Sequence, residues 1–160
     1  MWRHTFLRFP FQLIARRGAR RSHRLPPPYI IVYPKTVLLV DEDQDSRVVY
    51  ATILEHAGYQ VIEAENGERG LWLACEHLPD LIVLELSVPV LDGFRLTEHL
   101  KRDSRMRRIA VLAVSAFAMA TDRERALRAG CDSYLTKPCR PSRVLEEVQR
   151  FIGPPSELVA

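Results

Sequence analysis

Short apolar runs alternate with longer amphipathic segments over most of the chain. Five runs are predicted to be β-strands: Thr36–Val40, Gln60–Ala64, Leu81–Leu86, Ile109–Ser115 and Ser133–Thr136. Several of them, such as Thr36–Val40, are almost continuously apolar, which is typical of strands buried on both faces of a parallel sheet.

The segments between these runs carry apolar residues at helical spacing. Helices are predicted over Asp45–Ala57, from Asn66-Gly67 to Glu76, from Phe94 to about Leu100, over Asp122–Ala129 and from Pro141 to Ile152. Gly58 and Gly130 stand where the first and fourth helices end, and Pro141 suits the first turn of the last one. Five strand–helix pairs predict a doubly wound α/β domain.

Charge is unevenly distributed along the 160 residues. The chain has a formal net charge of +3, yet residues 1–35 contain seven Arg, one Lys and no acid, so residues 36–160 carry a net charge of −5. The basic balance therefore belongs to an N-terminal extension. It is no evidence that the folded part binds nucleic acid, and we expect no direct nucleic-acid binding by that part.

The length and the 47% hydrophobic content suit one domain. We expect a basic, poorly ordered extension over 1–35, because Pro10 interrupts any helix and Pro26–Pro28 favour an extended linker. A transit peptide or a membrane-surface anchor are alternatives for this segment. The domain is predicted at 36–153, followed by a short tail at 154–160.

Three cysteines, Cys75, Cys131 and Cys139, form no C-x-x-C pair. They are interpreted as reduced thiols of a cytoplasmic protein. No apolar stretch approaches the roughly 18–20 residues of a transmembrane helix, so no membrane span is expected.

Polar residues gather where the predicted strands end. Asp41 and Glu42 follow the first strand, Glu85 lies in the third, Ser115 ends the fourth and Lys137 follows the fifth. The carboxyl ends of parallel strands share one edge of the sheet, so these side chains should converge there. Clustered acids repel one another unless a cation neutralises them, which favours a divalent ion, with Mg²⁺ as the leading candidate.

At this point the chain resembles the response-regulator receiver family. Four motifs carry the resemblance: Val37-Leu-Leu-Val-Asp-Glu-Asp43, Pro79-Asp-Leu-Ile-Val-Leu-Glu-Leu-Ser-Val-Pro89 with Asp92-Gly93, Val114-Ser115-Ala116, and Tyr134-Leu-Thr-Lys137-Pro138. The match covers nearly all of 36–153. It implies a flavodoxin-like (βα)5 fold with a five-stranded parallel sheet in the order 2-1-3-4-5.

The resemblance also implies roles for individual residues. Asp41 and Glu42 would be the acidic pair that holds Mg²⁺, with the Ser87 carbonyl as a further ligand and Glu85 at the phospho-acceptor position. Ser115 and Lys137 would contact the phosphoryl group. Tyr134 would act with Ser115 in the conformational switch, and Lys137-Pro138 would be a cis peptide. Simpler roles stay open: Tyr134 could pack at a sheet edge and Ser115 could be an ordinary strand-end hydroxyl.

Two residues depart from the family pattern. Glu85 replaces the acceptor aspartate with a side chain one methylene longer, and Glu42 stands where aspartate is more common. A displacement of about 1 Å can cost on the order of 100-fold in phosphoryl transfer, so phosphorylation of Glu85 is expected to be very weak or absent. The longer arm could approach Ser115 and Lys137 and mimic the phosphorylated state, and Mg²⁺ binding would be weakened. The alternative is a degenerate receiver that serves as a phosphorylation-independent binding scaffold.

These features indicate a stand-alone receiver of phosphorelay signalling and not an enzyme. The resemblance implies that its output comes from protein contacts, through the surface of the fourth helix, fifth strand and fifth helix, with a sensor histidine kinase or another signalling protein as its partner. A haloacid-dehalogenase-like phosphatase is a remote alternative, since that family needs a further acidic motif after Lys137 and the next acid is Glu146. The partner kinase and the oligomeric state stay open.

Overall fold

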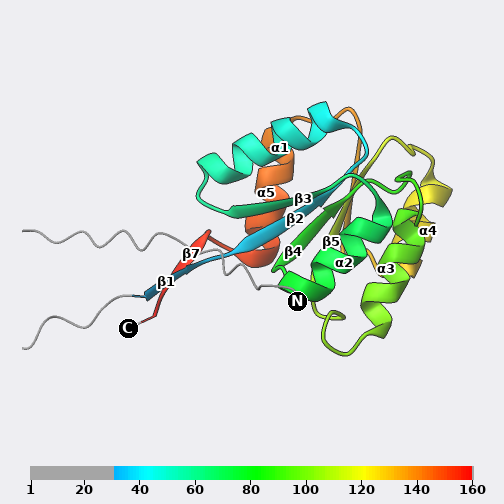
Figure 1. Cartoon of the computed structure of the whole chain (residues 1–160). Coiled ribbons are helices and arrows are strands. Elements are labelled where there is room, and N and C mark those ends of the chain that lie inside the picture. Colours follow the sequence, from blue (N-terminus) through cyan, green and yellow to red (C-terminus); the bar gives the residue numbers. More distant parts are fainter. Residues whose placement is uncertain (1–30, 160) are drawn as a thin grey trace, which may run out of the picture.

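A five-stranded parallel sheet forms the centre of the computed structural model, which describes residues 31–159. Its strands are β2 (Thr36–Val40), β3 (Gln60–Ala64), β4 (Leu81–Leu84), β5 (Ala110–Ser115) and β6 (Ser133–Thr136), in the order β3-β2-β4-β5-β6 (Figure 1). If these five strands are numbered 1 to 5 along the chain, the order is 2-1-3-4-5, as predicted. The predicted flavodoxin-like α/β fold is therefore confirmed.

Five helices cover the two faces of the sheet (Figure 1): α1 (Gln44–His56), α2 (Gly67–His77), α3 (Gly93–Arg102), α4 (Ala120–Ala129) and α5 (Pro141–Ile152). Successive side chains of a strand point to opposite faces. Leu38 and Val40 accordingly pack with α2, α3 and α4, whereas Val37 and Leu39 pack with α1 and α5. The three central strands β2, β4 and β5 are buried on both faces, which explains their continuous apolar sequences, whereas the edge strands β3 and β6 are partly exposed.

The predicted boundaries differ from the observed ones by a few residues. The strand predicted to reach Leu86 ends at Leu84, although the Glu85 amide still donates to the Val40 carbonyl. The fourth helix begins at Ala120, two residues before the predicted Asp122.

Asn66 caps the N-terminus of α2. Its side chain accepts a hydrogen bond from the Arg69 amide at 2.8 Å, which satisfies one of the free amides of the first turn. We expect Asn66→Ala to lower the free energy of unfolding by about 1 kcal/mol, measured by urea denaturation. Asn66→Asp is the matched control and should be nearly neutral, and equal losses in both variants would contradict the capping role.

A second, two-stranded sheet lies outside the predicted domain limits. β1 (Ile31–Pro34) pairs antiparallel with β7 (Ser156–Val159), and both strands project from the same end of the main sheet (Figure 1). The end of the predicted extension and most of the predicted tail thus form regular structure. Residues 1–30, including the alternatives of a transit peptide or a membrane anchor, lie outside the described residues, so the domain division stays a prediction.

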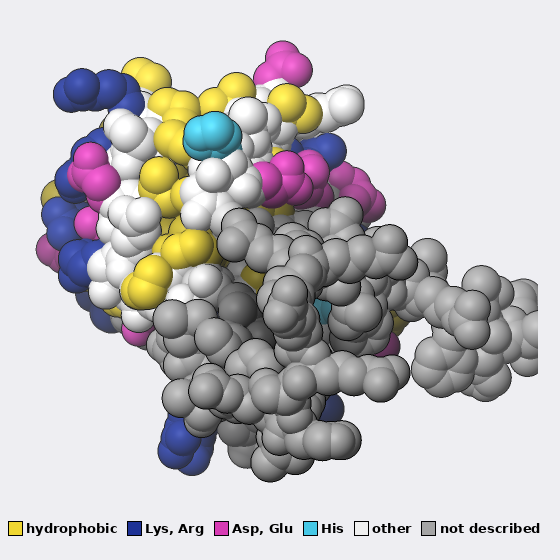
Figure 2. Space-filling model, turned by 90° about the vertical axis from the view of Figure 1, so that its left-hand side faces the viewer, with side chains coloured by type: hydrophobic (Ala, Val, Ile, Leu, Met, Phe, Trp, Pro, Cys, Tyr) yellow, Lys and Arg dark blue, Asp and Glu magenta, His cyan; other side chains and the backbone are white. Residues whose placement is uncertain are grey.

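The surface seen from the side of β1 and β7 is mixed in character. Figure 2 shows Lys and Arg side chains mixed with some Asp and Glu side chains along the left flank, a row of Asp and Glu side chains on the right, and hydrophobic side chains scattered between them. Within residues 31–159, no helix is long and apolar enough to cross a membrane.

Candidate functional site

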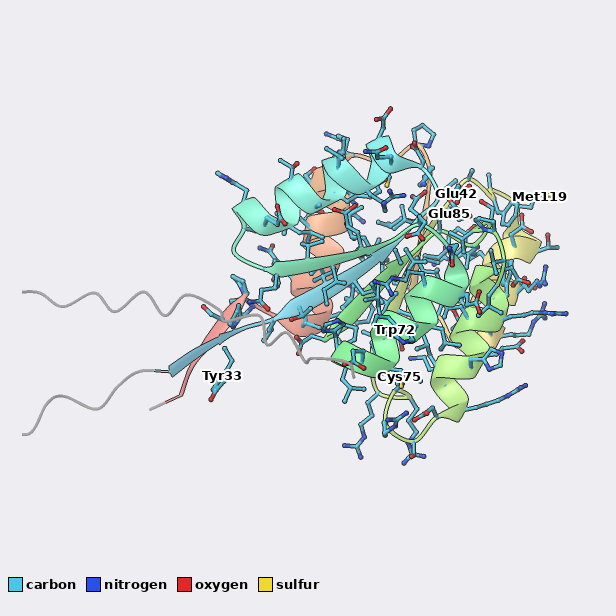
Figure 3. The ribbon with its side chains drawn as sticks, viewed as in Figure 1. Tyr33, Glu42, Trp72, Cys75, Glu85 and Met119 are labelled. Carbon is cyan, nitrogen blue, oxygen red and sulfur yellow. The ribbon has the colours of Figure 1, made fainter. Side chains whose placement is uncertain are left out.

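The carboxyl ends of β2, β4, β5 and β6 bring together four of the predicted site residues. Asp41, Glu85 and Ser115 are buried, with 6%, 3% and 0% of their surface exposed, and Lys137 reaches them from the loop after β6. Glu42 is exposed but lies near Glu85 at the same end of the sheet (Figure 3). Sequence spacing thus predicted the convergence correctly.

Glu85 is held by three donors. Its Oε1 accepts hydrogen bonds from the Ser115 hydroxyl at 2.5 Å and from the Ser87 amide at 3.2 Å, and its Oε2 lies 3.1 Å from Lys137 Nζ. Gly93 lets the following loop close tightly, since a Cβ there would lie 3.0 Å from the Glu85 carbonyl and 2.7 Å from Leu86 Cα. These contacts place the Glu85 carboxylate between Ser115 and Lys137.

Lys137 bridges two acids. Its Nζ lies 2.6 Å from Asp41 Oδ2 as well as 3.1 Å from Glu85 Oε2. The other Asp41 oxygen, Oδ1, accepts from the Asp43 amide at 2.9 Å. The Lys137-Pro138 peptide bond is cis, and the Lys137 amide donates to the Ser115 carbonyl, which ties this loop to the end of β5.

These contacts set the charge states of the site. Burial alone would raise the pKa of Glu85, but the bonds from Ser115 and Ser87 and the charge of Lys137 outweigh it and lower the pKa below its ordinary value. Burial alone would lower the pKa of Lys137, but Asp41 and Glu85 raise it. A Glu85 carboxylate facing a Lys137 ammonium is the state that this geometry favours at neutral pH.

A pH dependence of stability follows from the lowered pKa of Glu85. A carboxyl group with a lower pKa in the folded state stabilises the fold above its unfolded pKa of about 4.3, and loses that contribution as the pH falls through the folded value. We therefore expect wild type to exceed Glu85→Gln in free energy of unfolding by more at about pH 6 than at about pH 3. Urea denaturation across this range measures the difference, and a constant difference would contradict the ionised pairing.

A hydrogen-bonded path leads from Glu85 towards Tyr134. The Ser115 hydroxyl that donates to Glu85 also accepts from the Phe117 amide at 3.3 Å. The Phe117 carbonyl in turn accepts from the hydroxyl of Tyr134, which is half-buried. Phe117 was missed by sequence reasoning because it contributes backbone groups, which leave no signal in side-chain patterns.

A second missed residue, Arg47 on α1, braces the acidic loop. Its guanidinium donates to the Asp41 carbonyl at 2.7 Å and to Glu63 at 3.1 Å. An arginine one turn inside a helix that starts after an acidic loop was the only available signal, and by itself it is weak.

The arrangement does not fit the predicted metal site. Asp41 and Glu85 already share Lys137, and Glu42 is exposed. Over residues 31–159 there is no group of three or more His, Cys, Asp or Glu side chains placed to hold a metal ion. The three predicted acidic ligands, Asp41, Glu42 and Glu85, thus lie at one end of the sheet without being placed to hold one ion, and the Ser87 carbonyl stays a prediction.

Comparison with protein families and curated proteins gives a consistent match. The model of the response regulator receiver domain matches residues 37–149. The polar-differentiation response regulator DivK of Brucella anthropi is 38% identical over 120 residues, which is 75% of this chain and 98% of that protein. DivK of Brucella ovis is 36% identical, over 74% of this chain and 97% of its own length.

Solved structures share the fold. The chemotaxis protein CheY4 of Vibrio cholerae superposes with a TM-score of 0.71 at 25% identity, over 74% of this chain and 99% of that one. The receiver domain of the sensor histidine kinase PA1611 from Pseudomonas aeruginosa has a TM-score of 0.70 at 30% identity, over 76% and 99%. That structure is described with a magnesium ion coordinated in the active-site cleft.

Proposed function

The chain belongs to the response regulator receiver family, and we propose that Glu85 holds it in an active-like state without phosphorylation. In this proposal the protein relays a phosphorelay signal through contacts with other proteins and catalyses no reaction of its own. Its state is then set by a carboxylate of the chain.

The hydrogen bond from Ser115 to Glu85 carries the proposal. In the sequence-based prediction, Ser115 and Lys137 are the groups that contact a phosphoryl group. Here both contact the Glu85 carboxylate, at 2.5 and 3.1 Å. Mimicry would be partial, because one carboxylate has two oxygens and one charge, whereas a phosphoryl group has three oxygens and about −1.5 to −2 charges.

The path through Phe117 supports transmission of this state. It links Glu85 to Tyr134 through Ser115, and Tyr134 lies in β6, between the α4 and α5 segments of the predicted output surface. A change at Glu85 would therefore alter hydrogen bonds that reach this surface.

A binding scaffold that does not depend on Glu85 is the second candidate. One observation favours it: Glu85 is almost fully buried and has donors on both oxygens, so it could serve only to fill and stabilise the site. The two candidates differ in whether the output surface responds when the carboxylate is removed.

The proposed partner is a sensor histidine kinase or another signalling protein. We propose a cytoplasmic location, which the free thiols of Cys75, Cys131 and Cys139 support, because structural disulfides are rare in that compartment.

Amide NMR spectra of the wild type, Glu85→Gln and Glu85→Asp would test the proposal. Glutamine keeps the length of the side chain and removes its charge. We expect Glu85→Gln to shift the amide signals of Phe117, Tyr134 and the α4 residues. We also expect the wild-type spectrum to resemble that of phosphorylated Glu85→Asp more closely than that of unphosphorylated Glu85→Asp. If Glu85→Gln moved only the signals next to residue 85, the scaffold would be the better description.

A further inference from the structure

We propose that the Lys137 ammonium is the resident counter-ion of the acidic site, so that the folded domain adopts its Glu85-centred arrangement without binding Mg²⁺. The inference rests on the proposed function only in taking this arrangement as the working state. It concerns how the site is neutralised, and it departs from the magnesium binding expected from the sequence.

The buried carboxylate oxygens already have donors. Asp41 Oδ1 accepts from the Asp43 amide and Oδ2 faces Lys137, while Glu85 Oε1 accepts from Ser115 and Ser87 and Oε2 faces Lys137. Among the described residues, no buried side-chain nitrogen or oxygen atom is left without a hydrogen-bond partner. An inner-sphere cation would therefore have to displace a donor that is already in place.

Lys137 is well placed to replace a cation. It lies within 3.1 Å of both carboxylates, so a single charge reduces the repulsion between two acids buried to 6% and 3% exposure. Opposite charges in contact interact far more strongly in such a site than in water. The ammonium is part of the chain, so it loses no translational freedom on binding, in contrast to a metal ion taken from solution.

The extra methylene of Glu85 explains why its carboxylate contacts both Lys137 and Ser115. It extends the carboxylate far enough to reach Lys137 and Ser115 together, as the distances of 3.1 and 2.5 Å show. Glu42 stays exposed, and Arg47 holds the neighbouring Asp41 carbonyl. Mg²⁺ usually needs one or two carboxylates together with substrate phosphates, and one exposed carboxylate is a weak site for it.

Isothermal titration of the metal-free full chain with MgCl₂ up to about 10 mM, at constant ionic strength, tests the inference. We expect no saturable binding by wild type. Lys137→Met should gain affinity of about tenfold or more, because it leaves two carboxylates without their cation. Lys101→Met is the matched control: Lys101 has a similar exposure, 23% against 19%, and pairs with Asp132 at 3.0 Å outside the site. It should gain nothing.

Saturable Mg²⁺ binding by wild type with a Kd of about 1 mM or tighter would overturn the inference. Should Lys137→Met fail to fold, Glu85→Asp takes its place, since the shorter arm withdraws from Lys137 and should likewise restore Mg²⁺ affinity. Failure of both variants to bind Mg²⁺ would also overturn the role of Lys137. Neither result touches the NMR comparison of wild type with Glu85→Gln, so the inference and the proposed function can fail separately.

Discussion

Glu85→Asp is expected to accept a phosphoryl group from acetyl phosphate at a rate at least about 100-fold above that of wild type. In wild type, the Glu85 carboxylate already occupies the hydrogen bonds of Ser115 and Lys137 that would otherwise stabilise the incoming group. Shortening the side chain by one methylene withdraws the carboxylate and leaves both groups available.

Intact-mass measurement after incubation with acetyl phosphate and Mg²⁺ follows this reaction directly. Glu85→Gln is the matched control, because it keeps the side-chain length and cannot form an acyl phosphate. If wild type gained a stable phosphoryl group as readily as Glu85→Asp, the geometric argument about Glu85 would be wrong.

Lys137→Met is expected to lower the free energy of unfolding by about 3–5 kcal/mol at neutral pH. Methionine keeps much of the aliphatic volume but removes the charge shared by Asp41 and Glu85, which leaves two buried carboxylates without it. Uncompensated buried charges of this kind are among the most destabilising single changes.

Urea denaturation measures this loss, and Lys101→Met again provides the control. Lys101 pairs with the partly exposed Asp132, so we expect Lys101→Met to lower the free energy of unfolding by only about 1 kcal/mol. Adding Asp41→Asn to Lys137→Met should recover part of the stability, because it removes one of the unpaired charges. Equal losses of unfolding free energy in the two lysine variants would contradict the role of Lys137 in neutralising Asp41 and Glu85.

The fold could be predicted from the sequence because the central strands β2, β4 and β5 are buried on both faces. In Thr36–Val40, for example, alternate residues serve two different cores, so nearly every position must be apolar. The convergence of Asp41, Glu85, Ser115 and Lys137 followed from the same reasoning, since parallel strands end at one edge of the sheet.

The details of the site depend on contacts that no local pattern encodes. The bridge from Lys137 to Asp41 joins residues 96 positions apart, and the Phe117 carbonyl that binds Tyr134 belongs to the backbone. The pairing of β1 with β7 joins the two ends of the described chain. Each of these strands is only four residues long, and its partner cannot be found from its own sequence.

The contact between Ser115 and Glu85 bears on how long the proposed active-like state lasts. An acyl phosphate on aspartate hydrolyses, so a signal stored there has a lifetime that a phosphatase or water can shorten. The Glu85 carboxylate is made once, when the chain is synthesised, and has no such decay. Under the proposed function, the signal would last as long as the protein itself. It would end only when the protein is degraded or is diluted by cell growth.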